Sequence, residues 1–172
     1  MSRINTPAVE TATGATAEVY AQIKKAAGKV PNTFAAIGAL APAALNAMLA
    51  AGSLSKQDQE TIKLLVSEIA GCDYCVAAHS LLGKMTGLKP DTLRRIRVGE
   101  PTGDDKRDAL TRFVRTLQET RGTISQEAYS AIKAASYTDA QLVEIALAIV
   151  IVSFTNLFNR VNDTDVDFPR AA

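Results

Sequence analysis

The stretch from Gly71 to His79, GCDYCVAAH, contains both cysteines and the only histidine of the 172-residue chain. A glycine precedes the first cysteine, two residues separate the cysteines, and three residues separate Cys75 from His79. Two thiols and an imidazole in so short a stretch indicate either a shared chemical task or a metal site.

Helical geometry would place these three side chains on one face. On a helix that turns about 100° per residue, Cys75 and His79 lie about 60° and 20° around the axis from Cys72. Side chains three residues apart lie about 5–6 Å apart at Cβ, near the separation that a disulfide requires. Gly71 places the pair in the first turn of a new helix, where free N–H groups and the helix dipole favour the thiolate. The motif therefore permits redox cycling between a dithiol and a disulfide.

The spacing also suggests roles for the two thiols. His79, four residues after Cys75, can accept the Cys75 proton directly or through water. This assigns Cys75 as the nucleophile and Cys72 as the resolving thiol. The order of attack in thioredoxin would be the reverse, because the N-terminal cysteine of its CxxC motif attacks.

A histidine base needs a carboxylate that orients it. Glu60 and Glu68 both lie on the predicted preceding helix. Were that helix unbroken, Glu60 would lie about 18 Å from Cys72, so it can serve only if Gly71 folds the chain back. Spacing alone leaves the choice between the two glutamates open.

The rest of the chain predicts helices almost throughout, because strand signals are nearly missing and capped, alanine-rich amphipathic segments recur. We expect an all-α fold of roughly seven to nine helices in a single domain over residues 1–172, with an arm at 1–14 and a tail at 163–172. The predicted helices cover residues 15–27, a short helix from 31 to a break at 41–42, a helix from there to about 51, then 55–70, 72–86, 90–99 and 104–121, a helix from 125, and a capped helix from 138 to about 162. Within the last of these, Ile145 to Phe154 is apolar on all sides, which predicts burial in the domain centre or against another subunit.

Composition and the chain start narrow the classes of partner. A net charge of +1, no tryptophan and 5% aromatic residues disfavour nucleic acid and anionic membranes. The polar start lacks the apolar region of a secretion signal, and the run from Ile145 to Phe154 is too short to span a bilayer. We expect a cytoplasmic protein that binds small molecules and other protein chains.

The arrangement of Glu60, Cys72-x-x-Cys75 and His79 resembles the core motif of the alkyl hydroperoxidase D (AhpD)-like family, in the carboxymuconolactone decarboxylase-like superfamily. The resemblance extends over most of the chain. Val30-Pro31-Asn32 is similar to the front half of the peroxidase-related branch, and Phe158-Asn159-Arg160 with Asp167-Phe168-Pro169 is similar to its back half.

The resemblance implies an all-helical, cofactor-free thiol peroxidase. In the family the second cysteine, matching Cys75, attacks the peroxide, and the first, matching Cys72, resolves the sulfenic acid as a disulfide. The residues that match His79 and Glu60 form a proton relay. The resemblance further implies trimers or hexamers, and a thiol electron donor such as a dihydrolipoamide-bearing protein.

One position departs from the family pattern. The best-known members carry a second histidine just before the nucleophile, where this chain has Tyr74, a poor base near neutral pH. Tyr74 is therefore a candidate site-lining residue, and the departure implies a lower peroxidase activity or a different oxidant.

Two alternatives remain beside the peroxidase. One is a general dithiol/disulfide oxidoreductase. The other is a non-enzymatic helical module in which Cys72, Cys75 and His79 hold zinc, completed by Asp73 or Glu60. We expect no metal and no cofactor in the preferred interpretation.

Overall fold

The computed structural model describes residues 6–48 and 52–171. Within these residues the secondary structure is entirely helical, which confirms the predicted all-α class. The elements are a short 3-10 helix (Val9–Thr11) and the α-helices α1 (Gly14–Ala27), α2 (Asn32–Leu40), α3 (Pro42–Met48), α4 (Lys56–Ile69), α5 (Asp73–Met85), α6 (Pro90–Val98), α7 (Asp105–Thr120), α8 (Gln126–Ala134) and α9 (Asp139–Asn162). The predicted starts agree with these bounds to within about two residues, and the predicted end of the third helix near residue 51 lies outside the described residues.

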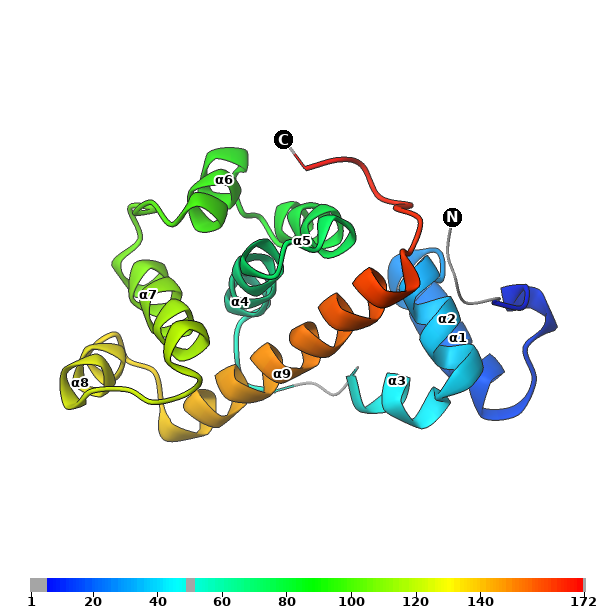
Figure 1. Ribbon diagram of the computed structural model, residues 1–172, viewed down its shortest axis with the longest axis horizontal. Helices are drawn as coiled ribbons and strands as arrows, with labels where there is room; N and C mark the ends of the chain where they lie inside the picture. Colours follow the sequence, from blue (N-terminus) through cyan, green and yellow to red (C-terminus); the bar gives the residue numbers. More distant parts are fainter. Residues whose placement is uncertain (1–5, 49–51, 172) are drawn as a thin grey trace. The chain divides into compact units, whose positions relative to one another are not determined.

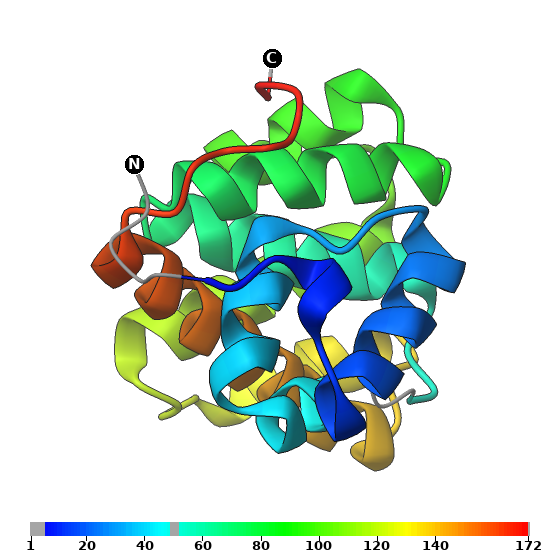
Figure 2. The same cartoon turned by 90° about the vertical axis from the view of Figure 1, so that its right-hand side faces the viewer.

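Contacts along the chain define two compact units. The first comprises Met1–Ala51 with Leu157–Asp167, and the second comprises Gly52–Asn156 with Phe168–Ala172. In the first unit α1 packs against α2 and α3 around an apolar cluster of Val19, Tyr20, Ile23, Ile37 and Leu45 (Figure 2). A buried hydrogen bond from Thr33 Oγ1 to Asn159 Oδ1, 2.7 Å long, ties α2 to the end of α9.

The second unit is built around α4, which packs against α5, α6 and α7 (Figure 1). The face of α4 that carries Ile62, Leu65 and Val66 is almost completely buried in the main apolar core. Ser55 caps the start of this helix, because its hydroxyl accepts the backbone N–H of Asp58 at 3.0 Å. The central helix α4 and its neighbour α5 supply the cysteine motif and its surroundings.

The turn between α4 and α5 reverses the chain at Gly71. The N–H groups of Gly71 and Cys72 donate to the carbonyl oxygens of Glu68 and Ser67 at 3.0 and 3.1 Å, which is the hydrogen-bond pattern of a Schellman motif. Gly71 has a φ of 62°, in the left-handed region that glycine adopts without steric cost. The glycine that ends α4 thus sends the chain directly into α5, antiparallel to α4.

The long helix α9 is less buried than its sequence predicts. Ile145 and Val152 are buried in the core of the second unit, but Leu147, Val150 and Phe154 are exposed. The prediction that this run is buried in the domain centre on all sides is therefore wrong. Helical periodicity explains the difference, because a single core contacts only one face of a helix.

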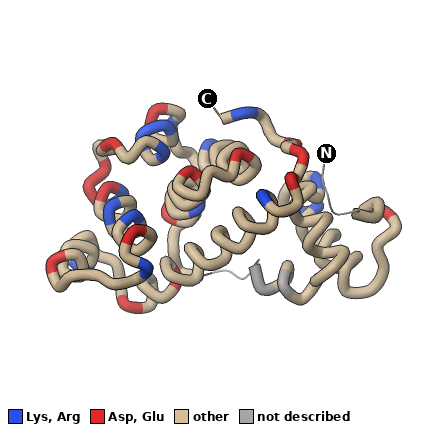
Figure 3. Tube along the Cα trace, in the orientation of Figure 1, with Lys and Arg blue, Asp and Glu red and all other residues tan. Residues whose placement is uncertain are grey.

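The same helix has the dimensions of a membrane span. The run from Ile145 to Phe154 is too short, but the whole of α9 is long and apolar enough to cross a bilayer by length and composition. Figure 3 shows no charged residue along α9 except near its two ends. A core helix of a soluble protein meets the same criterion, so length and composition do not by themselves indicate a membrane.

Candidate active site

The two cysteines lie at the N-terminus of α5. Cys72 is the N-cap residue rather than the first helical residue, and its Sγ accepts the backbone N–H of Cys75 at 3.4 Å. The two Sγ atoms are 2.6 Å apart and are not joined by a disulfide, and both residues are buried, with 2% and 3% of their surface exposed. The structure thus brings the two sulfurs together at a helix end whose N–H groups stabilise negative charge.

His79 and Glu60 form a partly buried pair across the α4–α5 interface. His79 Nδ1 lies 2.8 Å from Glu60 Oε2, and the other carboxylate oxygen of Glu60 accepts from Lys63 Nζ at 3.1 Å. The chain reversal at Gly71 makes this contact possible. The sequence predicted that Glu60 could orient His79 only if the chain folded back at this glycine. Both carboxylate oxygens of Glu60 therefore have a cationic or polar partner.

The protonation state of Glu60 follows from these partners. Burial alone would raise the pKa of the Glu60 carboxyl, but His79 and Lys63 outweigh it and hold that pKa below its usual range. The carboxylate is thus ionised at neutral pH and can only accept hydrogen bonds. An ionised carboxylate can only accept in the His79 contact, so the hydrogen between them is on Nδ1, and Nε2 is the ring nitrogen that faces away from Glu60 and can exchange a proton.

The other glutamate considered from the sequence is engaged elsewhere. The carboxylate of Glu68 accepts a hydrogen bond from Arg97 Nε at 2.6 Å, in an ion pair between α4 and α6. Of the two glutamates, the structure therefore pairs Glu60 and not Glu68 with His79.

Tyr74 lies in the same apolar cluster as the two cysteines. Its ring is buried and meets the ring of Phe168 edge-on, with centroids 5.4 Å apart. Such edge-to-face contacts are favourable arrangements of two aromatic rings. Tyr74 therefore borders the thiols, and Phe168 of the C-terminal tail packs against the same cluster.

The zinc alternative requires at least three clustered ligands. Within residues 6–48 and 52–171, no three His, Cys, Asp or Glu side chains are placed so that they could hold a metal ion.

Two neighbours of the site were not singled out from the sequence. Lys63, which shares the Glu60 carboxylate, lies three residues after it on α4, a spacing at which helix side chains meet. Phe168 approaches the cysteines from the far end of the chain, and no local pattern predicts that contact.

Part of the chain matches a known protein family. Residues 31–114, which include α4 and α5, match the model of the carboxymuconolactone decarboxylase family. No functionally curated protein matches the chain. The family match therefore covers all four residues of the candidate site.

The fold is similar to that of several solved structures. A peroxidase-related protein from Ralstonia eutropha, described as an alkylhydroperoxidase AhpD core, superposes with a TM-score of 0.84 at 20% identity, over 96% of this chain and 92% of that one. A peroxidase-related protein from a Silicibacter species gives a TM-score of 0.78 at 20% identity, over 95% and 91%. A cysteine-to-alanine variant of the debrominase Bmp8, in complex with 2,3,4-tribromopyrrole, gives 0.76 at 18% identity, over 97% and 94%. Residues 31–114, just under half of the chain, thus match the carboxymuconolactone decarboxylase family, and the chain shares the fold of AhpD-like proteins.

Proposed function

We propose that the protein is a cytoplasmic, thiol-dependent peroxidase that reduces hydroperoxides through a Cys75/Cys72 dithiol cycle. One observation carries the proposal: two reduced thiols lie 2.6 Å apart at a helix N-terminus, on the helix whose His79 pairs with the largely buried Glu60 at 2.8 Å. A nucleophile, a resolving thiol and an oriented base are the groups that such a cycle needs. No cofactor takes part in it.

The chemistry balances without a further oxidant. The Cys75 thiolate attacks the outer peroxide oxygen, an S–O bond forms, the O–O bond breaks, and the alkoxide leaves as the alcohol with a proton supplied through His79. Cys72 then attacks the resulting sulfenic acid, and the S–S bond forms as water leaves. The protein loses two electrons and two hydrogens, and an external dithiol, such as a dihydrolipoamide-bearing protein, restores them.

Hydroperoxide is not the only oxidant compatible with this fold. One structure of similar fold is a debrominase, so the fold alone does not select the acceptor of electrons. A general dithiol/disulfide oxidoreductase would use the same two thiols. The His79–Glu60 pair favours the peroxidase, because expulsion of an alkoxide requires a proton donor, which a disulfide substrate needs less.

The proposal is tested by mass spectrometry of the reduced protein before and after one equivalent of tert-butyl hydroperoxide. We expect a loss of two hydrogens that peptide mapping assigns to a bond between Cys72 and Cys75. The same treatment with a small aromatic disulfide measures the competing activity. Thiols that survive peroxide but react rapidly with the disulfide would support the oxidoreductase and refute the peroxidase.

We further propose that the protein self-associates through α9. Val143, Leu147, Val150 and Phe154 are 70%, 54%, 65% and 43% exposed, and they follow the 4-3-4 spacing of a two-helix seam. A seam that alternates four and three residues has the same spacing in both directions, so it suits a second copy related by a two-fold axis. These side chains alone supply a substantial share of the roughly 800 Å² per partner that a stable interface buries.

If α9 mediates self-association, glutamate substitutions in its exposed apolar seam should lower the molecular mass of the protein in solution. We expect Leu147→Glu with Val150→Glu to halve the mass that light scattering measures in solution, because four buried carboxylates, two from each copy, would oppose one another in the pair. Leu40→Glu, at an apolar side chain 64% exposed on α2, is the matched control and should leave the mass unchanged. A parent protein that is monomeric at micromolar concentration would contradict the proposal.

A further inference from the structure

The two thiols are closed to solvent, although any reaction requires contact with a partner. Cys72 and Cys75 are almost completely buried, and so is Tyr74 between them. A hydroperoxide must reach a sulfur in order to be attacked, and a dithiol donor must reach the disulfide that results. Some neighbour of the thiols must therefore move before either step can occur.

The helices around the thiols are poorly suited to that movement. α5 carries the cysteines and packs against α4, the central helix of the second unit. Ile62 and Leu64 of α4 are completely buried, so a shift of this helix would open the main apolar core. Segments with few buried apolar contacts open far more readily than core helices.

One neighbour of the thiols belongs to a segment of that kind. Among the described residues, Phe168 is the partly buried apolar side chain that packs against the cluster of Cys72, Tyr74 and Cys75. Its ring meets the ring of Tyr74 edge-on, with centroids 5.4 Å apart. Residues 164–171 form no helix or strand. Because Phe168 is itself partly exposed, it forms an outer layer of this cluster.

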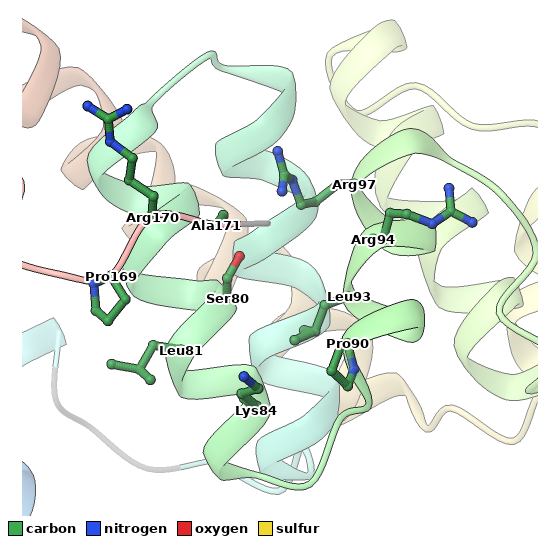
Figure 4. A pocket seen from close by; sticks show the side chains of 10 residues that line it. All are labelled: Ser80, Leu81, Lys84, Pro90, Leu93, Arg94, Arg97, Pro169, Arg170 and Ala171. Carbon is green, nitrogen blue, oxygen red and sulfur yellow. The ribbon is translucent and has the colours of Figure 1, made fainter.

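The tail beyond Phe168 is loosely packed. Pro169, Arg170 and Ala171 line one side of a cavity of about 140 Å³, and residues of α5 and α6 line the other (Figure 4). Figure 4 also shows the Arg170 side chain directed away from the cavity. A wall that faces a cavity lacks the van der Waals contacts of a close-packed one. The tail can therefore lift without the unfolding of a helix.

The sequence around Phe168 favours its return to the cluster. Pro169 follows it directly, and a residue before proline is restricted to extended backbone conformations. A residue with few accessible backbone conformations loses little entropy when it docks. Phe168 is thus suited to open and to close again.

We propose that Phe168 is a gate over Cys72 and Cys75 that determines which reactants reach the thiols. Resting on the proposed peroxidase function, the closed gate admits small hydroperoxides and excludes bulky ones. It opens when a protein donor brings its dithiol to the Cys72–Cys75 disulfide. Phe168 is then a specificity-determining residue that makes and breaks no bond itself.

The gate is tested without turnover, by the alkylation rates of the reduced protein with two maleimides that share one reactive group. N-ethylmaleimide is small, and N-(1-pyrenyl)maleimide carries a rigid aromatic system. An open state that is populated to about 10% or less slows the bulky reagent about tenfold or more, so Phe168→Ala should raise the pyrenyl rate by that factor. The rate with N-ethylmaleimide should change by less than about twofold, because the closed gate already admits small molecules.

Two further variants make the result specific to the Phe168 ring. Phe168→Leu keeps a smaller apolar cover and should give an intermediate pyrenyl rate. Val166→Ala shortens an exposed apolar side chain of the same tail and should react like the parent. Because unfolding would accelerate both reagents alike, the ratio of the two rates reports the gate. A ratio that is the same in the parent, Phe168→Leu and Phe168→Ala would overturn the proposal.

The effect on substrate choice is tested by single-turnover thiol oxidation with hydrogen peroxide and with cumene hydroperoxide. We expect Phe168→Ala to react about tenfold faster than the parent with cumene hydroperoxide and equally fast with hydrogen peroxide. If the variant keeps the parent's preference between the two peroxides, the gate is refuted and the peroxidase function stands. If neither peroxide oxidises the thiols, the proposed function fails, and the maleimide rates still decide whether Phe168 controls access.

Discussion

Replacing Cys75 with serine should reduce hydroperoxide consumption by at least about a thousandfold, because the variant lacks the attacking sulfur while the rest of the site is kept. Serine is close to cysteine in size, and the helix start at Cys72 does not depend on the Cys75 side chain. The measurement is the rate of peroxide loss with the reduced variant under single-turnover conditions. Circular dichroism of the same sample confirms that the helices are retained.

The Cys72→Ser variant tests whether Cys72 is the resolving thiol. Cys75 can still attack peroxide there, but no thiol remains to trap the product, so we expect a stable sulfenic acid that dimedone labels at Cys75. Parent protein treated in the same way should form the disulfide and resist labelling. The two variants thus separate the attacking thiol from the resolving one.

The structure also gives a physical reason for the opposite assignment. Cys72 is the N-cap residue, and its sulfur accepts the N–H of Cys75, so the helix end directly stabilises negative charge on Cys72. If Cys72 attacks first, Cys72→Ser will lose activity and Cys75→Ser will accumulate the dimedone adduct at Cys72. That result would replace our assignment by the thioredoxin order.

The helix boundaries were predictable because local chemistry sets them. Ser55 caps α4, and Thr138 and Gln141 hydrogen-bond to each other's backbone N–H at 3.2 and 3.0 Å in the capping box of α9. The burial of α9 was not predictable in the same way. A run that is apolar on every side does not encode which face meets the core, and tertiary packing left Leu147 and Val150 exposed.

In the candidate site too, the features set by local sequence were predictable and those set by tertiary packing were not. One short segment carries Cys72, Cys75 and His79, so helical spacing alone placed them on one side. The contact between His79 and Glu60 depends on the chain reversal at Gly71. Sequence spacing shows that such a reversal is required, but it does not show whether Glu60 or Glu68 pairs with His79. The contact between Tyr74 and Phe168 forms only in three dimensions, because the two rings lie 94 residues apart in the sequence and no local pattern predicts it.

Replacing Glu60 with glutamine should slow peroxide reduction by about 10²- to 10⁴-fold, through the tautomer of His79. The amide of glutamine can donate to Nδ1, which moves the imidazole hydrogen to Nε2 and removes the lone pair that serves as the base. Glu68→Gln makes the same change on the same helix, at a carboxylate paired with Arg97, and should keep nearly full activity. The measurement is the single-turnover rate of thiol oxidation for parent and both variants. A Glu60→Gln protein as fast as Glu68→Gln would refute the relay.

The same substitution should change how stability depends on pH. The pKa of Glu60 is lowered in the folded protein, so its ionised form contributes stability at neutral pH, and this contribution is lost as the pH falls through the folded-state value. Glutamine cannot titrate, so the variant lacks this contribution at every pH. We expect Glu60→Gln to be less stable than the parent by about 1–3 kcal/mol near pH 7, and the gap to narrow in acid. Urea unfolding at a series of pH values measures the gap, and a difference that stays constant down to pH values well below the ordinary glutamate pKa would show that His79 and Lys63 do not hold a buried carboxylate.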